Sequence, residues 1–252
     1  MPKPPHYGIN MIIHGPAKHG KSSLADTSPA PRVVIDAEGG SLFTPSSKTV
    51  WDPLSEPVPV VDGTWETAIV HPRNYDTVLK VYQILDQQEH PFRSVVMDSI
   101  SEVQQKCVNA IAGVNPMQTQ DWGTLLRKVS DLARNFRDLT KHPRHPLDAV
   151  VIIAMTKQED GKWIPFVQGQ LKTTLPYYFD LCTYLCRVQT PGGQEIRRLF
   201  VAPVAGFETG ERVGGRLGPY LDNANIAEML DVIRHGAPGA GLKDAEPAKT
   251  ST

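Results

Sequence analysis

The feature that most constrains this chain is INMIIHGPAKHGKSS at residues 9–23, where an apolar run opens into a loop with two glycines. The loop fits the pattern G-x-x-x-x-G-K-[ST], with Gly15, Gly20, Lys21 and Ser22 at the fixed positions. Small residues let such a loop fold around a phosphate, so that N–H groups and the next helix N-terminus point at it. In this pattern the lysine reaches the β- and γ-phosphates and the serine hydroxyl binds Mg²⁺.

A nucleotide is therefore expected to contact the loop and the first residues of the helix that follows. The expected residues are Gly15, Pro16, Ala17, Lys18, His19, Gly20, Lys21, Ser22 and Ser23. A chance Gly-Lys-Ser loop is the alternative interpretation. The buried strand predicted at residues 9–13 and the helix predicted at residues 22–27 supply the context that the pattern requires, and they favour the phosphate site.

Two further apolar runs end on carboxylates. The run RVVID at residues 32–36 leads into Glu38 and two glycines, and RSVVMDS at residues 93–99 contains Asp98. Ligands bind an α/β sheet at the carboxyl ends of its strands. Glu38 is therefore a candidate base for activating water, although an ordinary loop glutamate is the alternative, and Asp98 is a candidate to hold Mg²⁺ together with Ser22.

The length of 252 residues suits one α/β domain of ordinary size. We assign residues 1–235 to that domain and residues 236–252, which are rich in Gly, Pro and polar residues, to a disordered tail. Prolines number 22 and cluster in loops. Residues 44–63 contain four of them and are expected to form an irregular insertion, with a possible short strand at residues 58–61.

Composition and charge exclude some classes of protein. The formal net charge is −1, so nucleic-acid binding would require a local basic patch. The three cysteines, Cys107, Cys182 and Cys186, include no C-x-x-C pair, which favours reduced thiols over a disulfide framework. The first residues lack an apolar signal core, and no run approaches the roughly 18 apolar residues of a membrane span. We expect a soluble, cytoplasmic protein.

Periodicity predicts the remaining elements. Helices are expected at residues 72–88, 101–112, 121–142 and 225–234, with Asp121 capping the third and Trp122 in its apolar stripe. A buried strand is expected at residues 149–155, and strands at residues 179–188 and 195–201 surround a Pro-Gly-Gly turn as an antiparallel hairpin.

Two loops carry basic residues. After the strand at 149–155, Lys157, Lys162, Trp163 and Lys172 mix charge with an aromatic ring, a combination that can bind single-stranded DNA. A β-hairpin with Trp163 packed inward is an equal alternative. The glycine-rich residues 203–219 carry Arg212 and Arg216 and could deliver a guanidinium to a phosphate, or form a plain surface loop.

Taken together, GPAKHGKSS, VVIDAEGG, SVVMDSIS and AVVIIAM resemble the RecA-like ATPase core, and most closely the phage nucleotide-binding proteins of the RecA-like single-strand annealing class. The similarity covers residues 7–233, and the first three motifs are the specific ones. It implies an α/β P-loop fold with a mainly parallel central sheet flanked by helices and a C-terminal antiparallel hairpin. It also implies ATP and Mg²⁺ as cofactors.

The resemblance assigns roles to individual residues. It implies that Glu38 activates the hydrolytic water, that Asp98 binds Mg²⁺, and that the loop after the strand at 149–155 senses the γ-phosphate beside DNA-binding loops. RecA has a glutamine at that strand end where this chain has Thr156, which leaves the coupling of ATP to DNA open. The resemblance also implies that Arg212 completes the site of a neighbouring subunit, with Arg216 as a lesser candidate.

The sequence therefore predicts an ATPase: a RecA-like phage recombination protein that binds single-stranded DNA and promotes annealing or strand pairing as a homo-oligomeric ring or filament. One alternative, favoured by the near-neutral charge, is a regulatory nucleotide-binding module that acts through a single-stranded DNA-binding protein. A small-molecule P-loop kinase is weaker, because no arginine-rich lid segment is evident. No base-reading motif distinguishes ATP from GTP.

Overall fold

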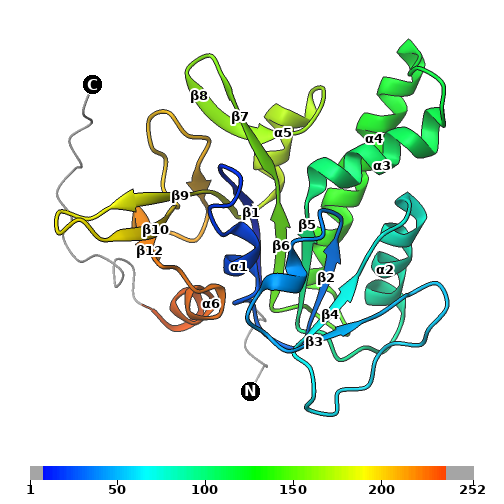
Figure 1. Ribbon diagram of the computed structural model, residues 1–252, viewed down its shortest axis with the longest axis horizontal. Helices are drawn as coiled ribbons and strands as arrows, with labels where there is room; N and C mark the ends of the chain where they lie inside the picture. The colour runs from blue at the N-terminus through cyan, green and yellow to red at the C-terminus, as the bar shows by residue number, and fades with distance from the viewer. Residues whose placement is uncertain (1–7, 237–252) are drawn as a thin grey trace.

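The computed structural model of the chain describes residues 8–236, which form a large central sheet flanked by helices (Figure 1). Its strands run in the order β12-β10-β9-β1-β6-β5-β2-β4-β3, with β11 beside β9. Neighbours from β9 to β3 are parallel, whereas β10, β11 and β12 pair antiparallel. The strands are β1 (Ile9–His14), β2 (Arg32–Asp36), β3 (Lys48–Val50), β4 (Thr67–Val70), β5 (Ser94–Asp98), β6 (Ala149–Ile153), β9 (Leu181–Gln189), β10 (Glu195–Phe200), β11 (Gly210–Glu211) and β12 (Tyr220–Asp222).

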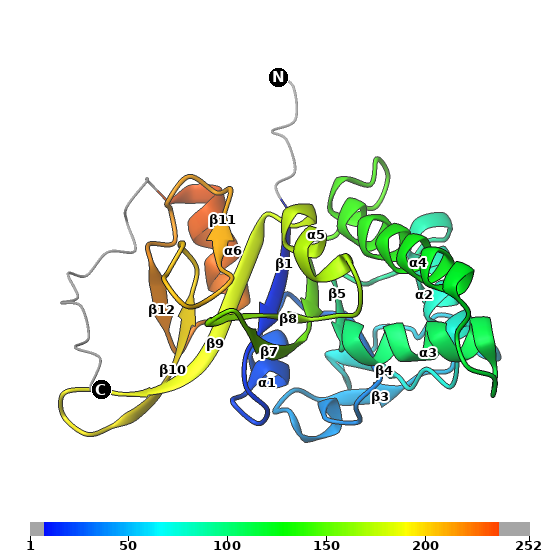
Figure 2. The same cartoon turned by 90° about the horizontal axis from the view of Figure 1, so that it is seen from above.

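Successive side chains of the buried strands enter two cores on opposite faces of the sheet, because side chains alternate along a strand. In β6, Val150 and Ile152 pack with α2 to α5, whereas Val151 and Ile153 pack with α1 and α6. Figure 2 shows α2, α3 and α4 beside β4 and β5, and α6 beside β9 and β12. The helices are α1 (Lys21–Ala25), α2 (Tyr75–Gln87), α3 (Ile100–Ala112), α4 (Thr119–Asp138), α5 (Leu171–Tyr178) and α6 (Ile226–His235).

The predicted fold class is confirmed. The sheet is mainly parallel with helices on both faces, and β9 and β10 form the expected antiparallel hairpin, in which Gln189 pairs with Glu195. Of the predicted disordered tail, only Gly236 is among the described residues. None of the helices within residues 8–236 combines the length and apolarity needed to cross a membrane.

The Pro-rich insertion is partly a strand. Residues 44–63 were expected to be irregular, but Lys48–Val50 forms the edge strand β3, parallel to β4. The short strand expected at residues 58–61 is absent, because Pro57 and Pro59 lie beside and within that segment and cannot donate a ladder hydrogen bond. The insertion therefore adds one edge strand to the central sheet.

Helix α4 begins earlier than expected. Gln118 is its N-cap, and Asp121 is the third helical residue, whose carboxylate accepts from the Gln118 N–H at 2.8 Å. Asp121 was predicted to be the N-cap, but it is the acidic residue of a capping box, three positions after the N-cap Gln118. The prediction that Trp122 belongs to the apolar stripe was also wrong, because its side chain is 46% exposed.

The strand predicted at residues 149–155 is divided. β6 ends at Ile153, and the chain then enters a separate two-stranded sheet, β7 (Met155–Glu159) and β8 (Lys162–Phe166). Asp160 and Gly161 connect the two strands, both with positive φ, so the β-hairpin that the sequence left as an alternative is formed. Helix α5 was missed, since Pro176 lies inside it and proline normally argues against a helix interior.

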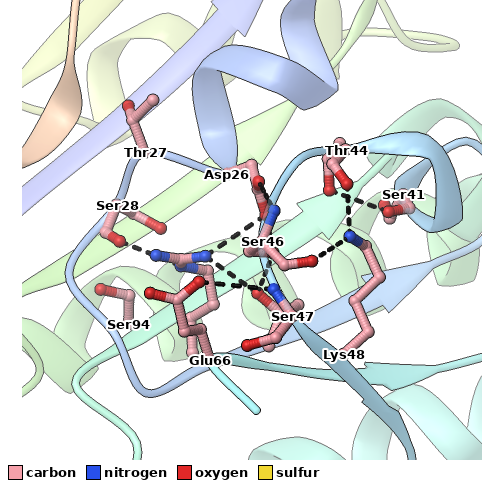
Figure 3. A network of polar contacts seen from close by, with 12 residues as sticks. Asp26, Thr27, Ser28, Ser41, Thr44, Ser46, Ser47, Lys48, Glu66 and Ser94 are labelled. Atoms are coloured by element: carbon pink, nitrogen blue, oxygen red, sulfur yellow. Dashed lines mark hydrogen bonds and ion pairs between the residues drawn. The ribbon is translucent and has the colours of Figure 1, made fainter. Parts of the chain in front are cut away.

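A polar network holds the C-terminal end of α1 against the sheet (Figure 3). Arg32 donates to the Asp26 carboxylate at 3.3 Å, to the Ser28 carbonyl at 2.9 Å and to the Thr67 hydroxyl at 2.9 Å. Asp26 also accepts from the backbone N–H and hydroxyl of Ser46. Because the Arg32 and Asp26 side chains are almost fully buried, this charged pair fixes the helix that follows the phosphate loop.

Candidate nucleotide-binding site

The loop between β1 and α1 has the backbone shape of an anion cradle. Lys18 and Gly20 adopt left-handed conformations, with φ of 64° and 93°, and residues of this kind turn successive N–H groups toward one point. Gly15 is required for a different reason. A Cβ at this position would lie 2.1 Å from the carbonyl oxygen of Leu185 in β9, so no side chain fits between the loop and that strand.

Lys21 lies across the mouth of the loop. Its ammonium donates to the carbonyls of Gly15 and Pro16, both at 2.9 Å. Burial lowers the pKa of Lys21, against the opposing effects of Glu38 and Asp98. An ammonium has three N–H groups, and these two contacts use two of them, so the folded-back lysine is prepared to donate to a phosphate as well.

Ser22 and Asp98 meet as predicted. The Ser22 hydroxyl donates to the Asp98 carboxylate at 2.6 Å, and Asp98 is only 2% exposed at the end of β5. Burial raises the pKa of Asp98 to about 6, and the Ser22 hydrogen bond acts in the opposite direction. A hydroxyl and a carboxylate brought together from α1 and β5 are hard oxygen donors, and they fit the ligand preference of Mg²⁺.

The loop that carries Glu38 is held by Asp36, a residue that sequence reasoning did not single out. The Asp36 carboxylate accepts from the N–H groups of Gly39, Gly40 and Ser41, at 2.8, 3.2 and 3.1 Å. The Glu38 N–H donates to the Asp98 carbonyl at 3.2 Å. An aspartate shortly before two glycines signals such a turn, so Asp36 could have been found from the sequence.

A cleft of about 780 Å³, called the phosphate cleft here, brings most predicted residues together. Its lining includes Gly15, Pro16, Ala17, Lys18, Gly20, Lys21, Ser22, Ser23, Glu38, Asp98, Thr156 and Trp163. His19 is not among them, because its Nδ1 accepts from the Arg187 N–H at 3.1 Å on the far side of the loop. Trp163 lines this phosphate cleft, although the sequence grouped it with Lys157, Lys162 and Lys172 as a DNA-binding residue.

A second cleft of about 660 Å³ lies between α4, the β7–β8 hairpin and α5, and is called the hairpin cleft here. Lys157 and Lys172 line it together with Trp122 and Phe166. The Lys157 ammonium lies 5.7 Å from the centre of the Phe166 ring. Both lysines also contact the Glu159 carboxylate.

Lys162 lies outside the hairpin cleft and forms an ion pair with Glu208 at 2.6 Å. Of the four residues predicted to bind DNA, the structure therefore brings Lys157 and Lys172 together and separates Lys162 and Trp163 from them.

Arg212 does not reach the phosphate cleft of its own chain. It follows β11, which pairs with the first residues of β9, and its guanidinium donates to the Tyr177 carbonyl at 2.5 Å. Arg216 donates to the Ile233 carbonyl. A role for Arg212 in the site of a neighbouring subunit stays a prediction.

Two other arginines lie beside the phosphate loop and were missed. Arg187 and Arg197 pair directly across the β9–β10 hairpin. Arg187 donates to the Lys18 carbonyl at 3.3 Å, and a Cβ on Gly20 would lie 2.8 Å from Arg197 Nη1. Because the two arginines are equally spaced from the Pro-Gly-Gly turn, the predicted hairpin register would have revealed them. They line a third cleft of about 470 Å³, which shares Lys18, Gly20 and Ser23 with the phosphate cleft.

A phosphate loop follows the parallel strand β1, and a serine of the next helix meets an aspartate at the carboxyl end of β5. These features define a P-loop nucleotide-binding α/β domain. A family model described as an AAA domain matches residues 7–213. The chain therefore belongs to this AAA-domain family.

Curated proteins give no match to this chain. Among solved structures, the RadB recombinase aligns with a TM-score of 0.44 at 15% identity over 77% of this chain and 80% of that one. An ATPase from the type III secretion system of pathogenic bacteria aligns with a TM-score of 0.45 at 12% identity, over 73% of this chain and 53% of that one.

Proposed function

We propose that this protein binds ATP with Mg²⁺ and hydrolyses it. The observation that carries the proposal is that Lys21, the Ser22–Asp98 pair and Glu38 all line one cleft. Lys21 and the loop amides hold the phosphates, and Ser22 and Asp98 hold the cation. A bound Mg²⁺ would supply positive charge that offsets the charge of the phosphates. Glu38, on a loop fixed by Asp36, orients a water molecule toward the γ-phosphate.

The cleft beside Arg187 and Arg197 gives the rest of the nucleotide a place to lie. Lys18, Gly20 and Ser23 line both this cleft and the phosphate cleft. Two arginines facing each other across a hairpin repel one another unless an anion or carboxylate lies nearby. Within residues 8–236 the one carboxylate lining this cleft is that of Glu195, at 2.8 Å from Arg187. This supports a nucleotide whose α-phosphate lies near Arg197.

The test of hydrolysis is a comparison of Glu38→Gln with wild type. We expect Glu38→Gln to bind ATP normally and to lose turnover by about a hundredfold or more, because the variant cannot accept a proton from water. Glu228→Gln, an exposed change on α6, is the matched control and should leave turnover unchanged. Normal turnover in Glu38→Gln would exclude Glu38 as the base.

We further propose that the protein acts on single-stranded DNA as a RecA-like recombination protein of the phage annealing class, assembled as a ring or filament. Support comes from the hairpin cleft, where the exposed aromatic rings of Trp122 and Phe166 lie with Lys157 and Lys172. Bases stack on such rings, while lysines follow the phosphate backbone. In the assembly, Arg212 is expected to contact the nucleotide of the neighbouring subunit.

A second candidate function is favoured by the ion pairs of the same lysines. Lys157 and Lys172 share Glu159, and Lys162 pairs with Glu208, so little net positive charge faces DNA. This supports a nucleotide-binding module that reaches DNA through a single-stranded DNA-binding protein. ATP hydrolysis with and without single-stranded DNA, at two salt concentrations, separates the two. Stimulation that falls with salt supports direct binding, and stimulation that appears only with the partner protein supports the second function.

A further inference from the structure

His14 is a buried histidine to which the proposed chemistry gives no role. It is the last residue of β1, immediately before the phosphate loop, and its side chain is fully buried. Its ring lies edge-on to Tyr184 of β9, with the ring centres 5.1 Å apart. A polar ring in this position needs partners for both nitrogens.

Both ring nitrogens of His14 contact the β7–β8 hairpin, one directly and the other through Glu208. Nδ1 lies 3.1 Å from the hydroxyl oxygen of Thr156 in β7, and Nε2 lies 2.8 Å from the carbonyl oxygen of Glu208. Glu208 is itself attached to β8, through its N–H to the Trp163 carbonyl at 2.8 Å and through its carboxylate to Lys162. His14 is thus a contact point between the phosphate-loop strand and the hairpin.

The number of N–H groups on the His14 ring determines which of its nitrogens donates a hydrogen bond. Burial lowers the pKa of His14 to about 4, so near pH 7 the ring is neutral and carries one N–H. The Glu208 carbonyl can only accept, which places that hydrogen on Nε2. Nδ1 is then an acceptor, and the Thr156 hydroxyl, which also lies 3.0 Å from the Ile164 carbonyl, is the group that can donate to it.

The Thr156 hydroxyl has a single hydrogen and several acceptors within reach. One is His14 Nδ1, and another is the Ile164 carbonyl at 3.0 Å on the opposite strand of the hairpin. Thr156 also lines the phosphate cleft. The oxygens of a fully ionised γ-phosphate only accept hydrogen bonds, so a nucleoside triphosphate would add a third acceptor.

We propose that His14 is a positioning residue of the nucleotide site: by accepting the Thr156 hydroxyl it holds the β7–β8 hairpin against the end of β1, and the γ-phosphate competes for that hydrogen. The inference rests on the proposed binding of ATP. It follows that ATP loosens the hairpin from β1, whereas ADP, which lacks the γ-phosphate, leaves the contact in place. The hairpin also lines the hairpin cleft, so the state of the nucleotide would reach the proposed DNA-binding surface through this histidine.

Two substitutions of His14 separate its contacts. Asparagine places its amide near the Nδ1 position, so His14→Asn keeps an acceptor for Thr156. Glutamine places its amide near the Nε2 position, so His14→Gln keeps a donor for Glu208 and loses the acceptor for Thr156. The readouts are the affinity ratio of a non-hydrolysable ATP analogue to ADP, by calorimetry, and amide hydrogen exchange of residues 155–166.

We expect the ATP analogue, but not ADP, to speed exchange of the hairpin amides in wild type and in His14→Asn. In His14→Gln the hydroxyl is free for the phosphate, so the affinity ratio should rise about two- to tenfold, and exchange should be fast with either nucleotide. Thr156→Val, which leaves β1 untouched, should lower the ratio instead, and adding His14→Gln to it should then change nothing.

The outcomes that overturn the proposal are distinct from failure of the proposed function. If wild type binds neither nucleotide, the proposed function fails and the competition fails with it. If nucleotides bind but His14→Gln changes both affinities equally, or acts equally in the Thr156→Val background, His14 has only a structural role. Should His14→Gln not fold, Thr156→Val decides through hydrogen exchange: its hairpin amides should exchange fast with ADP as well as with the ATP analogue, whereas Thr156→Ser should behave as wild type, and slow exchange of Thr156→Val with ADP would overturn the proposal.

Discussion

The phosphate cleft and the hairpin cleft both take residues from the β7–β8 hairpin but are built differently. Asp98 is 2% exposed and lies at the end of a strand that is buried on both faces, with its partner Ser22 at 2.6 Å. In the hairpin cleft, Trp122 and Phe166 are 46% and 38% exposed, and the lysines share a glutamate. One site is fixed by the core, whereas the other depends on surface side chains that have alternative partners.

The difference predicts how each site responds to mutation. A side chain positioned by buried strands has few alternative conformations, so its loss removes a function outright. A surface lysine that already pairs with a carboxylate gains little from a new anion, because exposed ion pairs contribute about 1 kcal/mol or less. The phosphate cleft should therefore give large, discrete effects, and the hairpin cleft small, salt-dependent ones.

The largest effect is expected from Lys21→Ala. Removing the ammonium that lies across the loop should lower ATP turnover by about a hundredfold or more, with the fold intact, since its contacts are to loop carbonyls. Turnover and thermal unfolding of the variant are the measurements. Lys106→Ala on α3, outside the cleft lining, is the control. Normal turnover in Lys21→Ala would refute the site.

Asp26→Ala tests the support beneath the phosphate cleft. The change leaves the buried Arg32 guanidinium without its carboxylate and removes two hydrogen bonds of Ser46. We expect the free energy of unfolding to fall by about 3 kcal/mol or more, measured by urea denaturation. Asp52→Ala, at an exposed turn of the Pro-rich insertion, should change it by less than about 1 kcal/mol. Equal effects would contradict the role given to the network.

The His14 ring predicts a pH dependence of stability. Burial lowers the pKa of His14 from 6.5 to about 4, so between these values the unfolded chain binds a proton more readily than the folded protein. The free energy of unfolding should therefore fall as the pH drops through this window, by up to about 3 kcal/mol.

Asp98 acts in the opposite direction over part of that pH range, because its pKa is raised in the folded protein. The measurement is therefore the difference between wild type and His14→Asn across pH, in which the contribution of Asp98 cancels. A difference that stays constant from pH 7 to about pH 4 would show that His14 does not titrate in this way.

The central strands and most of the phosphate cleft could be predicted from the sequence. The strands β1, β2, β5 and β6 are runs of β-branched and aliphatic residues because both of their faces are buried, and that pattern is local. The phosphate-loop motif is also local. Since parallel strands end at the same edge of a sheet, Ser22, Glu38 and Asp98 could be brought together before any coordinates were known.

The hairpin cleft could not be predicted in the same way. The net charge in and around it depends on ion pairs between separate elements, such as Glu159 with Lys172 in the cleft and Glu208 with Lys162 beside it. Trp122 has helical spacing that fits a core position, yet α5 and the hairpin leave it at the surface. Neither result follows from periodicity, because both depend on how separate elements pack.

Trp122→Ala should have a moderate effect on DNA. Loss of one stacking ring should weaken binding to a single-stranded oligonucleotide about five- to tenfold, measured by fluorescence anisotropy. Tyr177→Ala, which removes an exposed ring of α5 that does not line the hairpin cleft, is the matched control. Unchanged affinity in Trp122→Ala would remove the hairpin cleft from the proposed DNA-binding surface.

The smallest effect is expected from Lys172→Ala. A lysine that neutralises a phosphate contributes about one to the slope of log affinity against log salt. Because Lys172 is shared with Glu159, its loss should reduce that slope by less than about one. Glu159→Gln should change the slope in the opposite sense, since it releases Lys157 and Lys172 toward DNA. A slope that neither variant alters would favour the partner-dependent function.

The position of β1 in the sheet has a consequence for biosynthesis. This strand leaves the ribosome before both of its neighbours in the sheet, which are β6, starting at Ala149, and β9, starting at Leu181. The loop it carries can meet Leu185 only after β9 has been translated. A ribosome stalled midway would therefore display an unpaired apolar strand and an incomplete phosphate loop, and contacts this distant in sequence form slowly. Nucleotide capture should accordingly be among the last events in the maturation of this protein.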